Sequence, residues 1–130
     1  MFRHLRLEVS EITDVSAIPN WAPEGTEQIG KIEISEHSKK TRIRGSFSKG
    51  EDEFTIRISI YDAIPESYTA IYQKDDEMVM TYDAGGITHY IMANNENISA
   101  MWTNGCLEGY IQGVLTVEQL QRMIDSIYEE

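Results

Sequence analysis

The sequence predicts an α+β fold: a curved antiparallel meander sheet of about six to eight strands, packed against a C-terminal helix. Three observations lead to this prediction. Turn signals rich in Gly, Asp, Asn and Ser recur at short intervals along the chain. The segments between them have strand length, and several alternate apolar and polar residues. Only the final segment carries apolar residues at clear helical spacing, and the N-terminus leaves a second helix open.

The clearest strand is FTIRISIY at 54–61, where one face carries Phe54, Ile56, Ile58 and Ile60. Thr55, Arg57, Ser59 and Tyr61 alternate with them and point the other way. The segment TRIRGSF at 41–47 alternates similarly, with Ile43 and Phe47 opposed to Arg42 and Arg44. We expect both segments to bury one face against the core.

The predicted C-terminal helix begins at Thr116, a good N-cap residue, and Gln119 completes a capping box. One side of the helix carries Val117, Leu120, Met123, Ile124 and Ile127. This amphipathic pattern predicts a helix that packs on its own sheet rather than on a partner.

The first 20 residues are ambiguous. Leu5, Leu7 and Val9 alternate as in a strand, whereas Leu5, Val9 and Ile12 are spaced as in a helix. We interpret this part as a helix or a frayed segment that leads into the domain. The predicted organisation is therefore a lead-in segment at 1–17 and a single α+β domain at 18–130.

The dipeptide Asn104-Gly105 predicts a two-residue hairpin turn, because a type I′ turn needs positive φ at both central positions. This turn fixes a register in which the facing pairs are Thr103–Cys106, Trp102–Leu107, Ala100–Gly109 and Ile98–Ile111. The loop NNEN at 94–97 then places Ala93 opposite Ile98, Ile91 opposite Ala100 and His89 opposite Trp102. The loop DAGG at 83–86 places Met80 beside His89 and Met78 beside Ile91. In this register Trp102 and Leu107 lie on the core side.

The other face of this hairpin region carries four large side chains: Tyr90, Met92, Met101 and Tyr110. It is more apolar than an ordinary solvated face. Either a second layer covers it, or it is a binding surface for a protein partner or an apolar small molecule. These four residues are the predicted candidate surface.

The charge balance excludes some partners. The chain has 22 acidic and 11 basic residues, for a net charge of -11. Nucleic-acid binding depends on Lys and Arg that neutralise phosphates, so we expect no nucleic-acid partner. An anionic membrane surface is disfavoured for the same reason. No run approaches the roughly 18 apolar residues of a spanning helix, so we expect a membrane link only through a tether outside this chain.

No catalytic constellation stands out, and we expect a protein that is not an enzyme and holds no cofactor or metal. Cys106 is the single cysteine, and the predicted register puts His89 on the opposite face from it. The three histidines lack metal-ligand spacing. The acidic clusters at 51–53 and 75–77 lack the pattern of an EF-hand loop.

Two stretches carry a family resemblance. IPNWAPEGTE at 18–27 resembles the aromatic-x-Pro-Glu-Gly entry of a bacterial family, domain-of-unknown-function family 4367. The stretch 94–128 is similar to the close of that family: an Asn, a Trp before a Gly turn, Tyr-x-Ile-x-Gly, and a short helix that ends in Ser-Ile. The matching positions are Asn94, Trp102, Gly105, Tyr110, Ile111, Gly113, Leu120, Ile124, Ser126 and Ile127. Between the two stretches only the strand pattern matches.

The resemblance implies a compact α+β domain, often found outside the membrane of Gram-positive bacteria and attached to a transmembrane helix. In some members the cytoplasmic part resembles an anti-sigma factor, and no catalytic residues are implied. The first functional hypothesis is therefore a non-enzymatic extracytoplasmic sensing or protein-interaction domain of a membrane-tethered signalling or envelope protein. The alternative is a carrier or sensor of an apolar, lipid-like ligand on a curved sheet.

Overall fold

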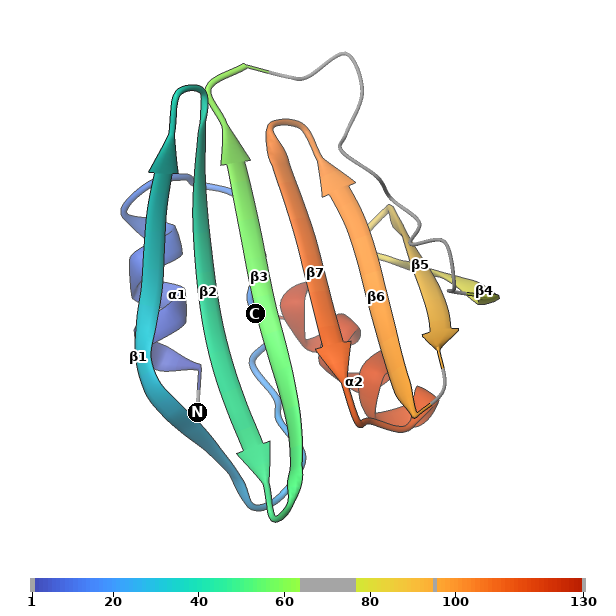
Figure 1. Cartoon of the computed structure of the whole chain (residues 1–130). Coiled ribbons are helices and arrows are strands. Elements are labelled where there is room, and N and C mark those ends of the chain that lie inside the picture. Colours follow the sequence, from blue (N-terminus) through green and yellow to red (C-terminus); the bar gives the residue numbers. More distant parts are fainter. Residues whose placement is uncertain (1, 64–76, 95, 130) are drawn as a thin grey trace.

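The computed structural model describes residues 2–63, 77–94 and 96–129. One sheet contains all seven described strands, and every strand pair in it is antiparallel. The elements in chain order are α1 (Arg3–Ser10), β1 (Thr26–His37), β2 (Lys40–Lys49), β3 (Asp52–Tyr61), β4 (Glu77–Ala84), β5 (Ile87–Asn94), β6 (Asn97–Asn104), β7 (Leu107–Gly113) and α2 (Val117–Ile127). Both helices lie on the same face of the sheet (Figure 1). The predicted α+β class, with its antiparallel sheet and C-terminal helix, is confirmed.

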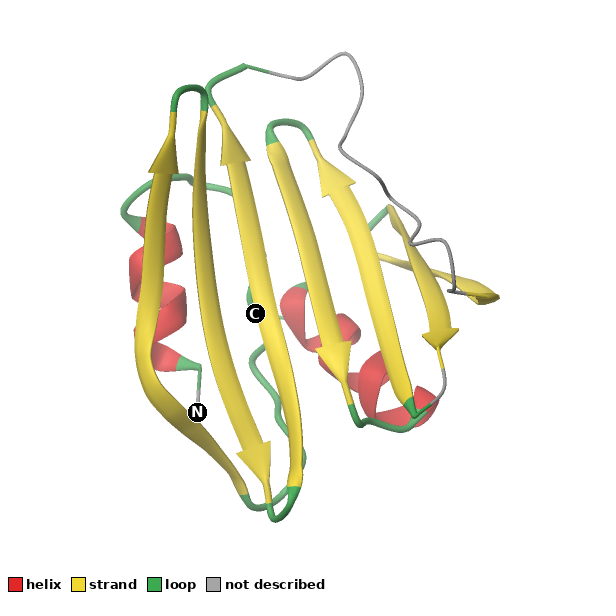
Figure 2. Cartoon of the chain, viewed as in Figure 1, coloured by secondary structure: helices red, strands yellow, loops and turns green. Residues whose placement is uncertain are grey.

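The sheet is built from two meanders that meet in its middle. Its strand order is β1-β2-β3-β7-β6-β5-β4, so β3 pairs with β7 although about half of the sheet lies between them in the sequence (Figure 2). The predicted continuous meander is therefore interrupted at this one pairing. Six of the seven residues of the central strand β7 are buried, and half of the residues of β3 are.

The N-terminal segment forms the helix α1, and its apolar side belongs to the same core as the sheet. Leu5 and Val9 are buried, and Phe2 packs edge-on against Phe47 with ring centroids 5.0 Å apart. Phe47 in turn stacks on Phe54 of β3 at 5.4 Å. The sequence left this segment as either a helix or a frayed lead-in, and the structure shows a packed helix. Aromatic side chains of β2 and β3 pack against Phe2 at its start.

The helix α2 begins as the sequence predicts. The Thr116 side chain accepts a hydrogen bond from the Gln119 backbone N–H at 3.0 Å, and the Gln119 side chain accepts one from the Thr116 backbone. The buried side of the helix consists of Leu120, Met123, Ile124, Ser126 and Ile127. The Ser126 hydroxyl accepts hydrogen bonds from the backbone N–H groups of Asn20 and Trp21. This contact ties the segment after α1 to α2.

The β6–β7 register differs from the prediction by two residues. Trp102 faces Gly109 rather than Leu107, and Asn104 faces Leu107. The central residues of the turn are Gly105 and Cys106, with Gly105 at φ +61°, rather than Asn104 and Gly105. A shift of two residues preserves the face on which each side chain lies, because side chains alternate with a period of two. The predicted core side is therefore correct although the predicted partners are wrong.

The pairing of β5 is partly as predicted. Ala93 faces Ile98 and Ile91 faces Ala100, which confirms the β5–β6 register. On the other side His89 faces Tyr82, not Met80, because Gly85 and Gly86 both take positive φ and make a tight two-residue turn. Met80 faces Ile91, and an irregularity before it brings Met78 opposite Met92.

Candidate functional site

The candidate site is the face of the sheet that points away from both helices, which we call the open face. Across five strands its middle row runs Arg44 (β2), Arg57 (β3), Tyr110 (β7), Met101 (β6) and Tyr90 (β5), each residue facing the next. Met92 lies in the adjacent row, opposite Ser99. The structure therefore brings the four residues predicted from the sequence together on one face.

The apolar part of the open face is largely buried. Met92, Met101 and Tyr110 form a cluster separate from the main core and are only 1%, 3% and 6% exposed, whereas Tyr90 is half-buried. Flexible methionine side chains pack readily against aromatic rings. Three of the four predicted residues are thus packed away from solvent in this conformation.

A cation covers the aromatic end of this cluster. The guanidinium of Arg57 lies over the Tyr110 ring, 4.5 Å from its centroid. This geometry gives a cation–π attraction that strengthens as water is excluded. Burial lowers the pKa of Arg57, and the neighbouring charge of Arg42 lowers it further.

Glu108 of β7 lies beside these arginines. Its facing residue on β3 is Ser59, which in turn faces Arg42 on β2, so a small side chain separates the carboxylate from that guanidinium. Burial raises the pKa of the Glu108 carboxyl, and the positive charges of Arg57, Lys40 and Arg42 oppose that shift. The side chain is 6% exposed.

Two polar atoms of the charged side chains beside Tyr110 are buried without a hydrogen-bond partner among the described residues: Oε2 of Glu108 and Nε of Arg42. Buried polar groups are normally satisfied, because an unmade hydrogen bond costs about 1–3 kcal/mol. The open face therefore combines a packed Met and Tyr cluster with charged groups whose hydrogen-bonding capacity is not used up.

The family is shown by a comparison with family models. The model for the domain of unknown function DUF4367 matches residues 16–127. The chain belongs to this family. No curated protein matches the chain. The match includes every described strand and α2, whereas α1 precedes it.

Sequence reasoning missed the charged residues of the open face in this DUF4367 domain. Alternation along the strands put Arg42 and Arg57 on the polar side of β2 and β3, and the same rule put Glu108 on the side of Tyr110. No local pattern in the sequence indicates that β3 pairs with β7, however. The sequence therefore could not predict that Arg57 lies close to Glu108 and Tyr110. That long-range pairing is what assembles the cluster.

His89 lies on the opposite, helix-covered face of the domain. Its Nδ1 donates to the Tyr82 backbone carbonyl at 3.1 Å, which leaves Nε2 to accept from the Tyr128 hydroxyl at 2.7 Å. Burial lowers the pKa of His89 and favours the neutral ring. Both ring nitrogens of His89 are therefore hydrogen-bonded within the core. Cys106 lies in the β6–β7 turn and not beside this histidine.

Within the described ranges, no group of three or more His, Cys, Asp or Glu side chains is arranged to hold a metal ion. The acidic cluster at 75–77 lies largely outside the described residues, since Asp75 and Asp76 are among those not described. None of the helices that the structure describes has the length and apolar character needed to cross a membrane.

Proposed function

We propose that this DUF4367 domain is a non-enzymatic sensing or protein-interaction domain, and that its open face contacts a protein partner. The row Arg44–Arg57–Tyr110–Met101–Tyr90 carries the proposal. Its accessible members, Arg44, Arg57 and Tyr90, would touch the partner, and the buried Met101 and Tyr110 would support them. Arg, Tyr and Met are the residue types enriched at the centres of protein interfaces, and Arg and Tyr are frequent hot spots. Here they form one continuous row on the face that neither helix covers.

The charge pattern of the open face supports a partner with acidic groups. Lys40, Arg42, Arg44 and Arg57 all come from β2 and β3, although the chain as a whole carries a net charge of -11. Glu33 of β1 faces Arg44 and Glu108 lies among the other cations, so four positive charges meet two carboxylates here. The remaining positive charge would steer a negatively charged surface toward this end of the sheet. The adjoining Tyr90 would add apolar contact.

The proposed setting follows from the family resemblance. We place the domain outside the membrane in a bacterial signalling or envelope protein, held there by a tether that lies beyond this chain. In such a protein, partner binding at the open face would be the sensed event. A cytoplasmic part that resembles an anti-sigma factor would then be one route by which the binding signal is passed on.

Catalysis is not part of the proposal. The buried imidazole, the most apparent acid–base candidate, has both nitrogens bonded within the core. General acid–base work requires a group within reach of the substrate.

The alternative function, a carrier of an apolar ligand on Tyr90, Met92, Met101 and Tyr110, has weaker support. Three of these side chains are only 1–6% exposed, so they offer little surface to a ligand. Both hollows described for the structure lie elsewhere, beside α1.

Site-specific photo-crosslinking in a host cell that expresses the full-length protein tests the proposal. A benzophenone amino acid at Tyr90 should give a discrete adduct, whereas the same probe at Gln121 of α2 should not. The double variant Arg44→Gln/Arg57→Gln should reduce the Tyr90 adduct at least fivefold. The charge-matched control Lys31→Gln/Lys39→Gln, at exposed positions of β1 and the β1–β2 turn, should leave the adduct unchanged. Equal adducts at both probe sites, or equal loss in both double variants, would refute a specific open-face partner.

A further inference from the structure

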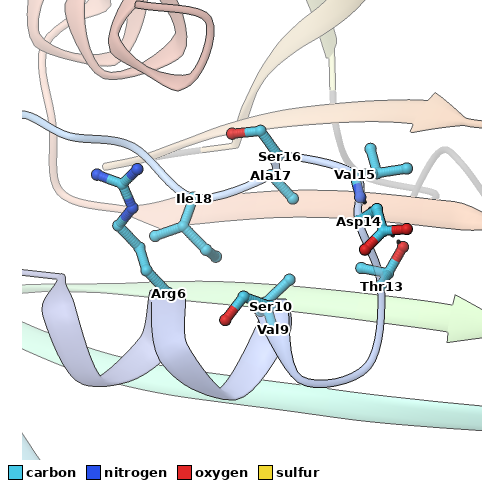
Figure 3. A pocket seen from close by; sticks show the side chains of 9 residues that line it. All are labelled: Arg6, Val9, Ser10, Thr13, Asp14, Val15, Ser16, Ala17 and Ile18. Carbon is cyan, nitrogen blue, oxygen red and sulfur yellow. Dashed lines mark hydrogen bonds between the residues drawn. The ribbon is translucent and has the colours of Figure 1, made fainter. Parts of the chain in front are cut away.

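Two adjoining hollows lie between α1 and the segment that follows it, residues 13–20, which we call the strap. The larger has a volume of about 430 Å³ and is lined in part by Phe2, Leu7 and Pro19. The smaller has a volume of about 300 Å³ and lies along Val9 and the strap (Figure 3). Arg6 and Ser10 line both, so the hollows form one groove along α1.

The larger hollow has one apolar side chain that solvent readily reaches, Leu7. Leu7 is 53% exposed, the most exposed of the large hydrophobic side chains described, because it lies outside the Leu5–Val9 side of α1 that packs on the sheet. Phe2 and Pro19 are buried beneath and beside it. The volume falls within the range of small-molecule sites, about 300–1,000 Å³.

Two cations line the same hollow, and its described lining includes no carboxylate. Arg3 and Arg6, three residues apart on α1, therefore lie on neighbouring positions of the helix surface. Neither guanidinium makes a hydrogen bond or an ion pair to any described residue, and no acidic side chain lines the larger hollow. For a chain with 22 acidic residues, a hollow lined by an exposed leucine and by two arginines that pair with no described residue is a local exception.

The arginines are positioned to receive an anion. Figure 3 shows the Arg6 side chain rising from α1 toward the strap beside Ile18, whereas Asp14 lies at the other end of the smaller hollow. Arginine presents several N–H donors in a planar fork that matches a carboxylate. The amide donors of Asn20 are directed to the carbonyls of Ser126 and Glu129, so the two arginines are left as the main donors to a ligand.

We propose that this groove binds a small amphipathic carboxylate, with its apolar part against Leu7 and Phe2 and its carboxylate on Arg3 and Arg6. The inference is independent of the open-face partner, because the groove lies on the opposite, helix-bearing side of the sheet (Figure 1). It goes beyond partner binding, since it gives the domain a small-molecule input. The charge complementarity selects an anionic head group, and the exposed Leu7 selects an apolar tail.

The probe pair octanoate and octylammonium tests this inference, because the two share a tail and differ in the sign of the head group. In ¹H–¹⁵N NMR titrations of the whole chain, octanoate should cause saturable shifts concentrated in residues 2–20. Octylammonium should bind at least tenfold more weakly. The variant Arg3→Gln/Arg6→Gln should weaken octanoate at least tenfold, whereas the charge-matched Lys31→Gln/Lys39→Gln should change the affinity less than twofold.

A second variant keeps the inference open to refutation if the arginine variant does not fold. Leu7→Ser, at an exposed position, should also weaken octanoate severalfold while the preference over octylammonium persists. Non-saturable shifts, shifts centred on the open face, equal binding of the two probes, or an arginine variant that folds and binds as tightly as its control would each overturn the inference.

Discussion

Gly109 is a position at which one added methyl group should be costly. It faces Trp102 across the β6–β7 hairpin, and the indole lies directly over its backbone. A Cβ at Gly109 would overlap the five–six ring junction and Nε1 of the indole. Trp102 is 1% exposed, and the His89 ring closes its other side with centroids 5.1 Å apart. The indole is therefore buried and packed against both Gly109 and His89.

The expected cost of Gly109→Ala follows from these contacts. Overpacking a core by a methyl group typically costs about 1–3 kcal/mol. Complete expulsion of the tryptophan, which buries 150–250 Å², would cost about 4–6 kcal/mol. Because the ring must move by about 1 Å or more against a neighbouring ring to restore ordinary contact, we expect the free energy of unfolding to fall by about 3 kcal/mol.

Urea unfolding followed by far-UV circular dichroism measures this loss, and tryptophan fluorescence reports the environment of the ring. The control is Gly105→Ala, where nothing lies within 4 Å of the added Cβ and only the positive φ of +61° is penalised, at about 1 kcal/mol. In a Trp102→Leu background the cost of Gly109→Ala should shrink by at least 1 kcal/mol. A loss below about 1 kcal/mol, or the same loss in both backgrounds, would refute the steric reasoning.

Three further predictions concern α2 and the histidine that it covers. Thr116→Ala removes the N-cap hydrogen bond and should lower the free energy of unfolding by about 1 kcal/mol, and an unchanged urea midpoint would contradict this. Because burial lowers the pKa of folded His89, the unfolded chain takes up the proton first. Stability should therefore be full above pH about 6.5 and fall as the pH drops toward the lowered pKa, and urea midpoints measured from pH 7.5 downward should decline less in His89→Gln. Tyr128→Phe leaves Nε2 of the buried imidazole without a donor and should cost about 2 kcal/mol. Tyr82→Phe, which loses only an exposed hydrogen bond to Asp125, should cost less than half as much, and equal costs would contradict this assignment.

The functional surfaces of the domain are assembled by different levels of structure. On the open face, the grouping of Tyr90, Met92, Met101 and Tyr110 was predictable from the sequence. These residues lie on consecutive hairpins, and the alternation along each strand puts them on the same face. The groove along α1 was not predictable, since the sequence left that segment between a helix and a frayed lead-in. Whether its arginines line a hollow depends on where the strap runs, and the strap is positioned by the Ser126 hydroxyl, more than 100 residues away.

The sequence by itself determined what depends on local chemistry. Alternation in β2 and β3 set which side chains are buried, Thr116 and Gln119 set the start of α2, and the glycine turns closed the hairpins. Even the face of each residue in β6 and β7 was determined, because a register error of two residues leaves the faces unchanged. The tertiary structure decided the pairing of β3 with β7, which no local signal encodes, because it depends on how the two meanders bury their apolar faces under the same two helices. That pairing alone brings Arg57 onto Tyr110 and places Glu108 among the arginines, and so it creates the charged part of the open face.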